Sequence, residues 1–121
     1  QQHEQDLRAE SGLIINMSDI YVANPMPDRA YYSATKAGLE SLTLSYAKSL
    51  APAIRVNSIQ PGAIAFLPEY SEDAKTPVLQ GSLIAKTGGF GALLKAVDYL
   101  CNNEFVTATA LKVDGGRSVA R

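Results

Sequence analysis

Three short strand-like segments alternate with two longer helical patterns along this chain of 121 residues, and that order constrains the fold most. The strand-like segments lie at 13–17, 55–60 and 110–113, and the first is an apolar run without alternation, as in a buried parallel strand. The helical patterns cover about 31–50 and 92–100. Strand, helix, strand, helix, strand predicts an α/β fold in which helices connect parallel strands.

Apolar residues recur at three- and four-residue spacing in both helical patterns, and this predicts the faces that pack on the sheet. The stripes are Leu39, Leu42, Tyr46 and Leu50 in the first pattern and Leu93, Leu94, Val97 and Leu100 in the second. Between the patterns, 63–78 is predicted as an irregular loop because of Pro68 and Pro77, and a loop of this length is usually functional or mobile. A short helix is predicted near 78–86, ended by Gly88-Gly89.

Tyr32 and Lys36 are four residues apart, so they share one face of the first helix. A neighbouring ammonium lowers the pKa of a phenol, which would suit Tyr32 to general acid catalysis. Asp19, thirteen residues before Tyr32, directly follows the first strand, and Pro61-Gly62 ends the second. Parallel strands bring their carboxyl ends to one sheet edge, where we expect these residues. Asp19 would oppose ionisation of Tyr32, so the direction of the net pKa shift of Tyr32 stays open. A simple capping role for Asp19 after the strand also stays open.

Composition limits the classes of function. The formal net charge is −1 and no apolar run reaches the length of a membrane span, so neither a nucleic acid nor a membrane is expected as a partner. The single cysteine, Cys101, excludes an internal disulfide and indicates a reducing compartment, from which we expect a cytoplasmic protein. Its place after an apolar helix predicts that it is buried. No His, Cys and carboxylate cluster has metal-ligand spacing, so no metal is expected.

Four segments in this order resemble the C-terminal half of a short-chain dehydrogenase/reductase. They are Ile14-Ile15-Asn16-Met17-Ser18, Tyr32-x-x-x-Lys36, the stretch from Ile54 to Gly62, and Val113-Asp114-Gly115-Gly116. The resemblance implies that residues 1–121 form the C-terminal part of one doubly wound, Rossmann-like domain. The family's glycine-rich cofactor fingerprint is not in the chain, because Gly88-Gly89-Phe90-Gly91 has the wrong spacing and follows no strand. The N-terminal half of the domain is therefore expected outside these residues.

Asp19 narrows the resemblance, since most members of the family have serine at this position. An aspartate there is the pattern of pteridine reductases and of the related bacterial dihydromonapterin reductases. A ketone oxygen needs a neutral donor such as serine, whereas a carboxylate accepts hydrogen bonds or carries a proton, which suits the ring N–H groups of a pterin. The resemblance implies NADPH-dependent reduction of a pterin or folate.

The resemblance also implies residue roles. Tyr32 would donate the proton, Lys36 would bind the nicotinamide ribose, and Asp19 would relay the proton. The expected cofactor-binding residues are Met17, Ser18, Tyr32, Lys36, Pro61, Gly62 and Ile64. Asp19, Tyr32 and Phe66 would contact substrate, although Phe66 and Tyr70 could equally pack the loop. A homotetramer is expected by the same resemblance.

Two other functions stay open at this point. One is a general short-chain carbonyl or acyl reductase with an unusual residue at position 19. The other is a non-catalytic module that acts only in assembly, suggested by the missing cofactor fingerprint. An Asp19→Ser variant separates the two enzymes, because pterin reduction should fall whereas carbonyl reduction should improve or stay level.

Overall fold

A three-stranded parallel sheet forms the centre of the computed structural model, which describes residues 11–66 and 68–120. The strands are β1 (Gly12–Met17), β2 (Ile54–Pro61) and β3 (Ala110–Val113), in the order β1-β2-β3. Gly12 is opposite Ile54 in β2, and Ser58 is opposite Ala110 in β3. The prediction of an α/β fold with parallel strands joined by helices is confirmed.

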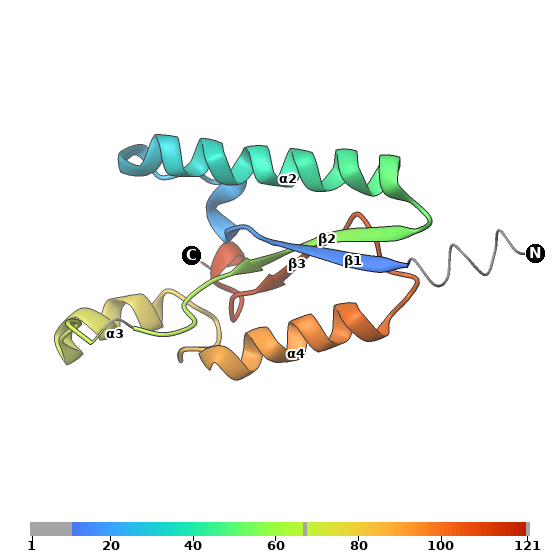
Figure 1. The fold of residues 1–121 in the computed structure, drawn as a ribbon. Helices are drawn as coiled ribbons and strands as arrows, with labels where there is room; N and C mark the ends of the chain where they lie inside the picture. Colours follow the sequence, from blue (N-terminus) through green and yellow to red (C-terminus); the bar gives the residue numbers. More distant parts are fainter. Residues whose placement is uncertain (1–10, 67, 121) are drawn as a thin grey trace, which may run out of the picture.

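Helices cover both faces of the sheet (Figure 1). The long helix α2 (Ala30–Leu50) lies on one face and α4 (Gly89–Asn102) on the other. The shorter α3 (Glu72–Gln80) lies beyond the edge at which β1 and β2 end (Figure 1). Three 3-10 helices lie in the connections: η1 (Ile20–Val22), η2 (Pro27–Arg29) and η3 (Arg117–Val119).

The core lies between β2 and α4. Ile59, Ala96 and Leu100 are buried there, and part-buried apolar side chains surround them. β1 is one of the two edge strands of the described sheet, and Ile14 and Met17 are each 41% exposed. The prediction of a buried first strand is therefore wrong, because within the described residues β1 has a strand neighbour on one side only.

Helix α2 packs on the sheet through small and polar residues. Its buried residues are Ser33, Thr43 and Ala47. The side-chain amide of Asn16 in β1 donates to Thr43 Oγ1 at 3.0 Å, so a polar contact joins α2 to β1. Two members of the predicted stripe, Leu42 and Tyr46, are each 49% exposed, so that part of the prediction is wrong.

The predicted apolar face of α4 agrees with the structure better than that of α2. Leu100 is buried in the core, and Leu93 and Val97 pack against it. Leu94 is 68% exposed and Cys101 is also exposed, which corrects both expectations. Each is one helical step, about 100°, away from a core residue and so faces solvent.

Helix α3 differs most from the sequence prediction of a loop to residue 78 and a helix near 78–86. It begins after Ser71, whose hydroxyl accepts the backbone N–H of Ala74 at 3.2 Å. Glu72 and Asp73 lie in the first turn, where negative charge favours a helix. These signals outweigh Pro77, which lies inside the helix and costs it one backbone bond. None of the α3 residues is buried.

Candidate active site

Asp19 lies where β1 ends and caps η1. Its Oδ1 accepts the backbone N–H of Tyr21 at 2.8 Å, which is the capping contact that the sequence left open. Its Oδ2 accepts the phenol O–H of Tyr32 at 3.0 Å. One carboxylate therefore fixes the loop after β1 and also contacts the first turn of α2.

Lys36 lies one turn beyond Tyr32 on α2. Its ammonium donates to the carbonyl oxygen of Met17 at 2.9 Å and lies 5.7 Å from the centre of the Tyr32 ring. The structure thus brings the three predicted catalytic side chains together at the carboxyl edge of the sheet. The helical spacing of Tyr32 and Lys36 and the end of β1 are sufficient to place them there.

The pKa of Tyr32 is raised above its ordinary value. Partial burial is the largest cause, followed by the hydrogen bond to the Asp19 carboxylate and by the negative charge of Asp19, while Arg29 acts in the opposite direction. The expectation that Lys36 lowers this pKa is not met in this structure, because burial and Asp19 together raise it. The phenol is thus held in its protonated form, as a proton donor must be.

Ser18 and Lys36 fit the polar groups of a nucleotide. Ser18 is buried, its backbone N–H donates to the carbonyl oxygen of Ile59 at 2.8 Å, and its hydroxyl has no partner among the described residues. A buried hydroxyl at a sheet edge without a partner is one that a ligand can satisfy. The ammonium of Lys36 has three N–H donors, and within the described part of the chain one of them is donated to the carbonyl oxygen of Met17. The others are left for vicinal ribose hydroxyls.

Pro61 and Gly62 lie at the same edge, where β2 ends. The backbone N–H of Gly62 donates to the carbonyl oxygen of Val113 at 3.0 Å. A Cβ at Gly62 would lie 2.8 Å from the Cβ of Asp114, so glycine is required for this close approach. The site surface at this position is therefore backbone.

Ile64 follows in a segment held against the start of α4. Its carbonyl oxygen accepts the backbone N–H of Gly89 at 2.8 Å, and the carbonyl of Ala63 accepts that of Gly88 at 3.1 Å. These glycine N–H groups are used within the fold. Gly88-Gly89 therefore begins a helix and holds the 63–64 segment, in agreement with its rejection as a nucleotide fingerprint.

Phe66 packs its loop against α3. Its ring centre lies 5.3 Å from that of Tyr70, and the ammonium of Lys75 in α3 lies 5.7 Å from the same ring centre. Lys75 also pairs with Glu72 at 3.0 Å. These ring contacts favour the loop-packing alternative for Phe66, and the structure gives it no ring contact or hydrogen bond with Asp19 or Tyr32.

Two residues that the sequence did not single out connect to this site. The Nε of Arg117 donates to the phenol oxygen of Tyr21 at 2.9 Å, and its Nη1 donates to the carbonyl of Val78 in α3. The signal in the sequence was the position of Arg117 directly after Asp114-Gly115-Gly116, a turn that reverses the chain at the sheet edge.

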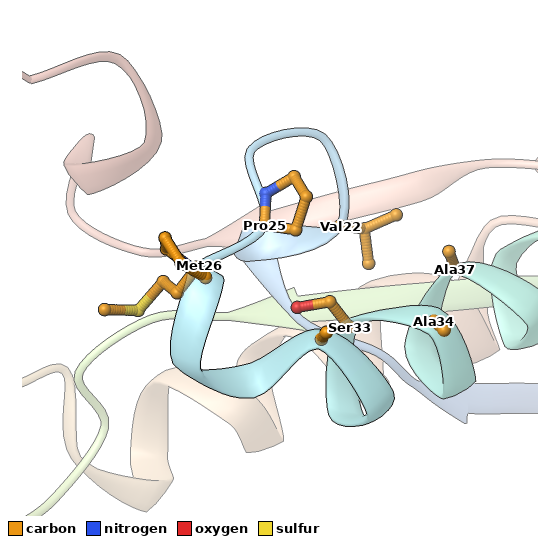
Figure 2. A pocket seen from close by; sticks show the side chains of 8 residues that line it. Val22, Pro25, Met26, Ser33, Ala34 and Ala37 are labelled. Atoms are coloured by element: carbon orange, nitrogen blue, oxygen red, sulfur yellow. The ribbon is translucent and has the colours of Figure 1, made fainter.

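A separate hollow lies beside α2 (Figure 2). This groove of about 380 Å³ is lined by Val22, Pro25, Met26, Pro27, Ala30, Ser33, Ala34 and Ala37. Ala34 and Ala37 are on the side of the helix away from Tyr32 and Lys36, since consecutive helical residues are about 100° apart. The groove is therefore not part of the Tyr32–Lys36 site.

The described residues also give two negative findings. No described helix is both long and apolar enough to cross a bilayer. No group of three or more His, Cys, Asp or Glu side chains in the described part of the chain is arranged to hold a metal ion.

Sequence comparison matches the chain to known reductases. The model of the family described as Enoyl-(Acyl carrier protein) reductase matches residues 1–118. A dihydromonapterin reductase of Escherichia coli strain 536 is 36% identical over 104 residues, covering 86% of this chain and 43% of the relative. The dihydromonapterin reductase of Enterobacter sp. strain 638 is 35% identical over 107 residues, covering 88% of this chain and 45% of the relative.

Solved structures give the same fold. FolM alternative dihydrofolate reductase 1 from Brucella suis, in complex with NADP, superposes with a TM-score of 0.85 at 25% identity. The match covers 94% of this chain and 46% of that one. The acetoin dehydrogenase YohF from Salmonella typhimurium has a TM-score of 0.78 at 30% identity and is covered to 46%, against 95% of this chain.

The matched relatives are longer than this chain, which spans less than half the length of the curated relatives and of the solved structures. The matched part carries the parallel sheet and the edge with Asp19, Tyr32 and Lys36. On the family match over residues 1–118 and the shared fold, the chain belongs to the short-chain dehydrogenase/reductase family, of whose Rossmann-like domain it forms a C-terminal part.

Proposed function

We propose that the protein containing this chain is an NADPH-dependent reductase of pterins, of the dihydromonapterin, dihydropteridine or dihydrofolate type. The observation that carries the proposal is the hydrogen bond of 3.0 Å from Tyr32 to Asp19, a carboxylate at the position where a ketone-reducing site needs a neutral donor. The names of the dihydromonapterin reductases and of the NADP-bound FolM structure support the substrate class and the cofactor.

NADPH, when bound, supplies the hydride. In this proposal Lys36 binds its nicotinamide ribose with the donors that Met17 leaves unused, and the hydroxyl of Ser18 offers a further polar contact. Met17, Pro61, Gly62 and the backbone of Ile64 complete the cofactor side of the site. Gly62 keeps the ends of β2 and β3 close together at this edge, because Asp114 occupies the space that a side chain at Gly62 would need.

Tyr32 donates the proton to a ring nitrogen of the pterin. The phenolate left behind is unfavourable beside Asp19, as the raised pKa of Tyr32 indicates. A proton must therefore return to Tyr32 quickly. Asp19, half-buried and already hydrogen-bonded to the phenol, is placed to pass that proton from water. Phe66 supplies an apolar surface for the ring if the loop that carries it moves towards the site.

The test is substrate preference in the full-length protein. NADPH oxidation is measured with dihydropterins and with simple ketones for the wild type, Asp19→Ser and Tyr32→Phe. We expect Asp19→Ser to reduce pterin turnover about 10–100-fold and Tyr32→Phe by at least 10²-fold. Glu104→Ser, which removes an exposed carboxylate after α4, is the control and should leave turnover unchanged.

The acetoin dehydrogenase match supports a second candidate, a short-chain carbonyl reductase. Turnover of ketones without turnover of dihydropterins, together with unchanged or improved ketone reduction by Asp19→Ser, would replace the pterin proposal with this one. Undetectable NADPH binding by the full-length protein would instead favour a non-catalytic module in assembly.

Assembly and location form a further part of the proposal. We propose a cytoplasmic homotetramer. Apolar side chains exposed on α2 support self-association, since Tyr31 is 92% exposed and Leu44 is 51% exposed. Analytical ultracentrifugation of the full-length protein decides this point, and a monomeric mass would contradict it.

A further inference from the structure

Arg117 joins three separate segments around the candidate site. It follows the turn after β3, and its guanidinium donates to Tyr21 in the loop after β1 and to the carbonyl of Val78 in α3. Tyr21 in turn donates its backbone N–H to Asp19, which accepts the phenol hydrogen of Tyr32. A path of hydrogen bonds that passes through the side chain and the backbone N–H of Tyr21 therefore leads from Arg117 to Tyr32.

The turn that carries Arg117 is itself fixed. Both carboxylate oxygens of Asp114 are used within it: Oδ1 accepts the backbone N–H of Gly116 at 3.1 Å and Oδ2 accepts that of Ser118 at 2.8 Å. Gly116 has a φ of 80°, a conformation that favours glycine. Arg117 thus starts from a constrained backbone, which fixes the position from which its side chain leaves the turn.

Gly81 makes room for the guanidinium. A Cβ at this position would lie 2.5 Å from Nη1 of Arg117 and 3.0 Å from its Cζ. The φ of Gly81 is −73°, which any residue can adopt, so the backbone conformation does not demand glycine here. Arg117 occupies the space that a side chain at position 81 would need, and this explains the glycine at the end of α3.

The guanidinium matters because α3 has few other attachments. None of its residues is buried, so apolar packing does little to hold it. Directly after it, the backbone N–H of Ile84 donates to the carbonyl of Gly115 at 2.8 Å, in the same turn that carries Arg117. Both attachments of the α3 end therefore lead to residues 114–117.

We propose that Arg117 is a positioning residue, which holds Asp19 in its orientation towards Tyr32 through Tyr21 and fixes α3 to the same loop. Its catalytic part rests on the proposed function, because it assigns Arg117 to the proton path of that reaction. Arg117 contacts neither Tyr32 nor Asp19 directly, so its effect on them passes through Tyr21.

The sharpest test removes one oxygen. Tyr21→Phe keeps the ring and the backbone N–H that Asp19 accepts but deletes the acceptor of Arg117, while Arg117→Gln shortens the side chain and removes the charge. Both are compared with the wild-type full-length protein and with Arg117→Lys, which keeps the charge and one donor group.

A pair of glycine variants tests the space around the guanidinium. Gly81→Ala crowds the guanidinium without changing its charge or its donors, and Gly91→Ala is the matched control, since a Cβ at Gly91 meets nothing within 4 Å.

The first readout is the pH titration of Tyr32, which requires no substrate. The ultraviolet phenolate signal of each variant is measured against the same variant carrying Tyr32→Phe, which isolates this tyrosine. Within the described part of the chain, the charged groups that act on or lie beside Tyr32 are Asp19, Arg29 and Lys36, and all three are left in place. Because Asp19 raises the pKa of Tyr32, we expect the midpoint to fall in Tyr21→Phe and Arg117→Gln, less in Arg117→Lys, and not in Gly91→Ala.

The second readout is turnover of a dihydropterin. We expect kcat to fall about 3–10-fold in Tyr21→Phe and Arg117→Gln through misplacement of Asp19, with NADPH affinity unchanged because Lys36 is not involved. The double variant should lose no more kcat than the worse single variant, since both break one path. Unchanged Tyr32 titration in a folded Tyr21→Phe protein would overturn the proposal. A shifted titration in a protein that reduces no pterin would support the positioning role and overturn only the proposed substrate.

Discussion

Asp19 accepts the phenol hydrogen of Tyr32 at 3.0 Å while its other oxygen accepts a backbone N–H of its own loop at 2.8 Å. A carboxylate that accepts a backbone N–H with one oxygen and a phenol hydrogen with the other has little freedom to rotate. The contact therefore adds to burial in raising the pKa of Tyr32, and it makes the cap of η1 and the contact with the phenol parts of one arrangement. Several measurable consequences depend on it.

The titration of Tyr32 should respond to the charge of Asp19. The folded-state pKa of Tyr32 is raised by burial and by Asp19, so this phenol stabilises the fold below the ordinary tyrosine pKa, and that contribution is lost as pH rises through the raised value. We expect Asp19→Asn to move the midpoint down. The phenolate absorbance of each protein, measured against its Tyr32→Phe counterpart, provides the value, and an unchanged midpoint would contradict the assignment.

Cofactor affinity should depend on Lys36. Replacing it with methionine keeps most of the side-chain volume and removes the ammonium that the proposal places on the ribose. We expect the Kd for NADPH to rise about 10-fold or more, the usual effect of losing a charged hydrogen bond. Calorimetric titration of the full-length protein measures it. Lys48→Met, in the last turn of α2, is the control, and an equal loss there would show that the effect is not local.

Two glycines should respond in opposite directions to the same substitution. A Cβ at Gly62 would lie 2.9 Å from the Cα of Asp114, so Gly62→Ala forces the ends of β2 and β3 apart and should cost about 1–3 kcal/mol. Gly38 lies inside α2 and a Cβ there meets nothing within 4 Å, so Gly38→Ala should stabilise the protein by about 0.5–1 kcal/mol. Chemical denaturation of both variants checks the pair, and equal effects would refute the packing argument at Gly62.

The carboxylate of Asp114 should make stability depend on pH. Partial burial acts to raise its pKa, but the N–H groups of Ser118 and Gly116 and the charge of Lys112 together lower it. A lowered folded-state pKa gives stability that is present above the ordinary carboxyl pKa and lost as pH falls through the lowered value. We expect Asp114→Asn to cost about 1–3 kcal/mol at neutral pH and less at roughly pH 3. Asp28→Asn, an exposed control, should show neither effect.

The candidate active site could be placed from the sequence because its positions depend on short-range rules. Tyr32 and Lys36 meet through helical spacing, and Asp19 joins them because β1 ends beside the start of α2. The parallel direction of the strands followed from the alternation of patterns. Each of these inferences needed only the local sequence and the general geometry of helices and parallel strands.

The remaining features depend on contacts between distant segments. Arg117 and Tyr21 are 96 positions apart, and no local pattern marks their hydrogen bond. Leu42 and Tyr46 look like a core stripe, but the buried face of α2 is the one with Ser33, Thr43 and Ala47. The start of α3 could have been predicted, because Ser71 followed by Glu72 and Asp73 is typical of a helix N-terminus. Pro77 led to the prediction of a loop instead.

Helix α3 buries none of its residues, while β2 and α4 carry the core. The part of the chain that holds the core is therefore separate from α3. Substitutions along the exposed side of α3 should cost little stability, provided that Gly81 and its contact with Arg117 are kept. A variant library restricted to α3 would alter this exposed surface on a scaffold whose folding stays constant.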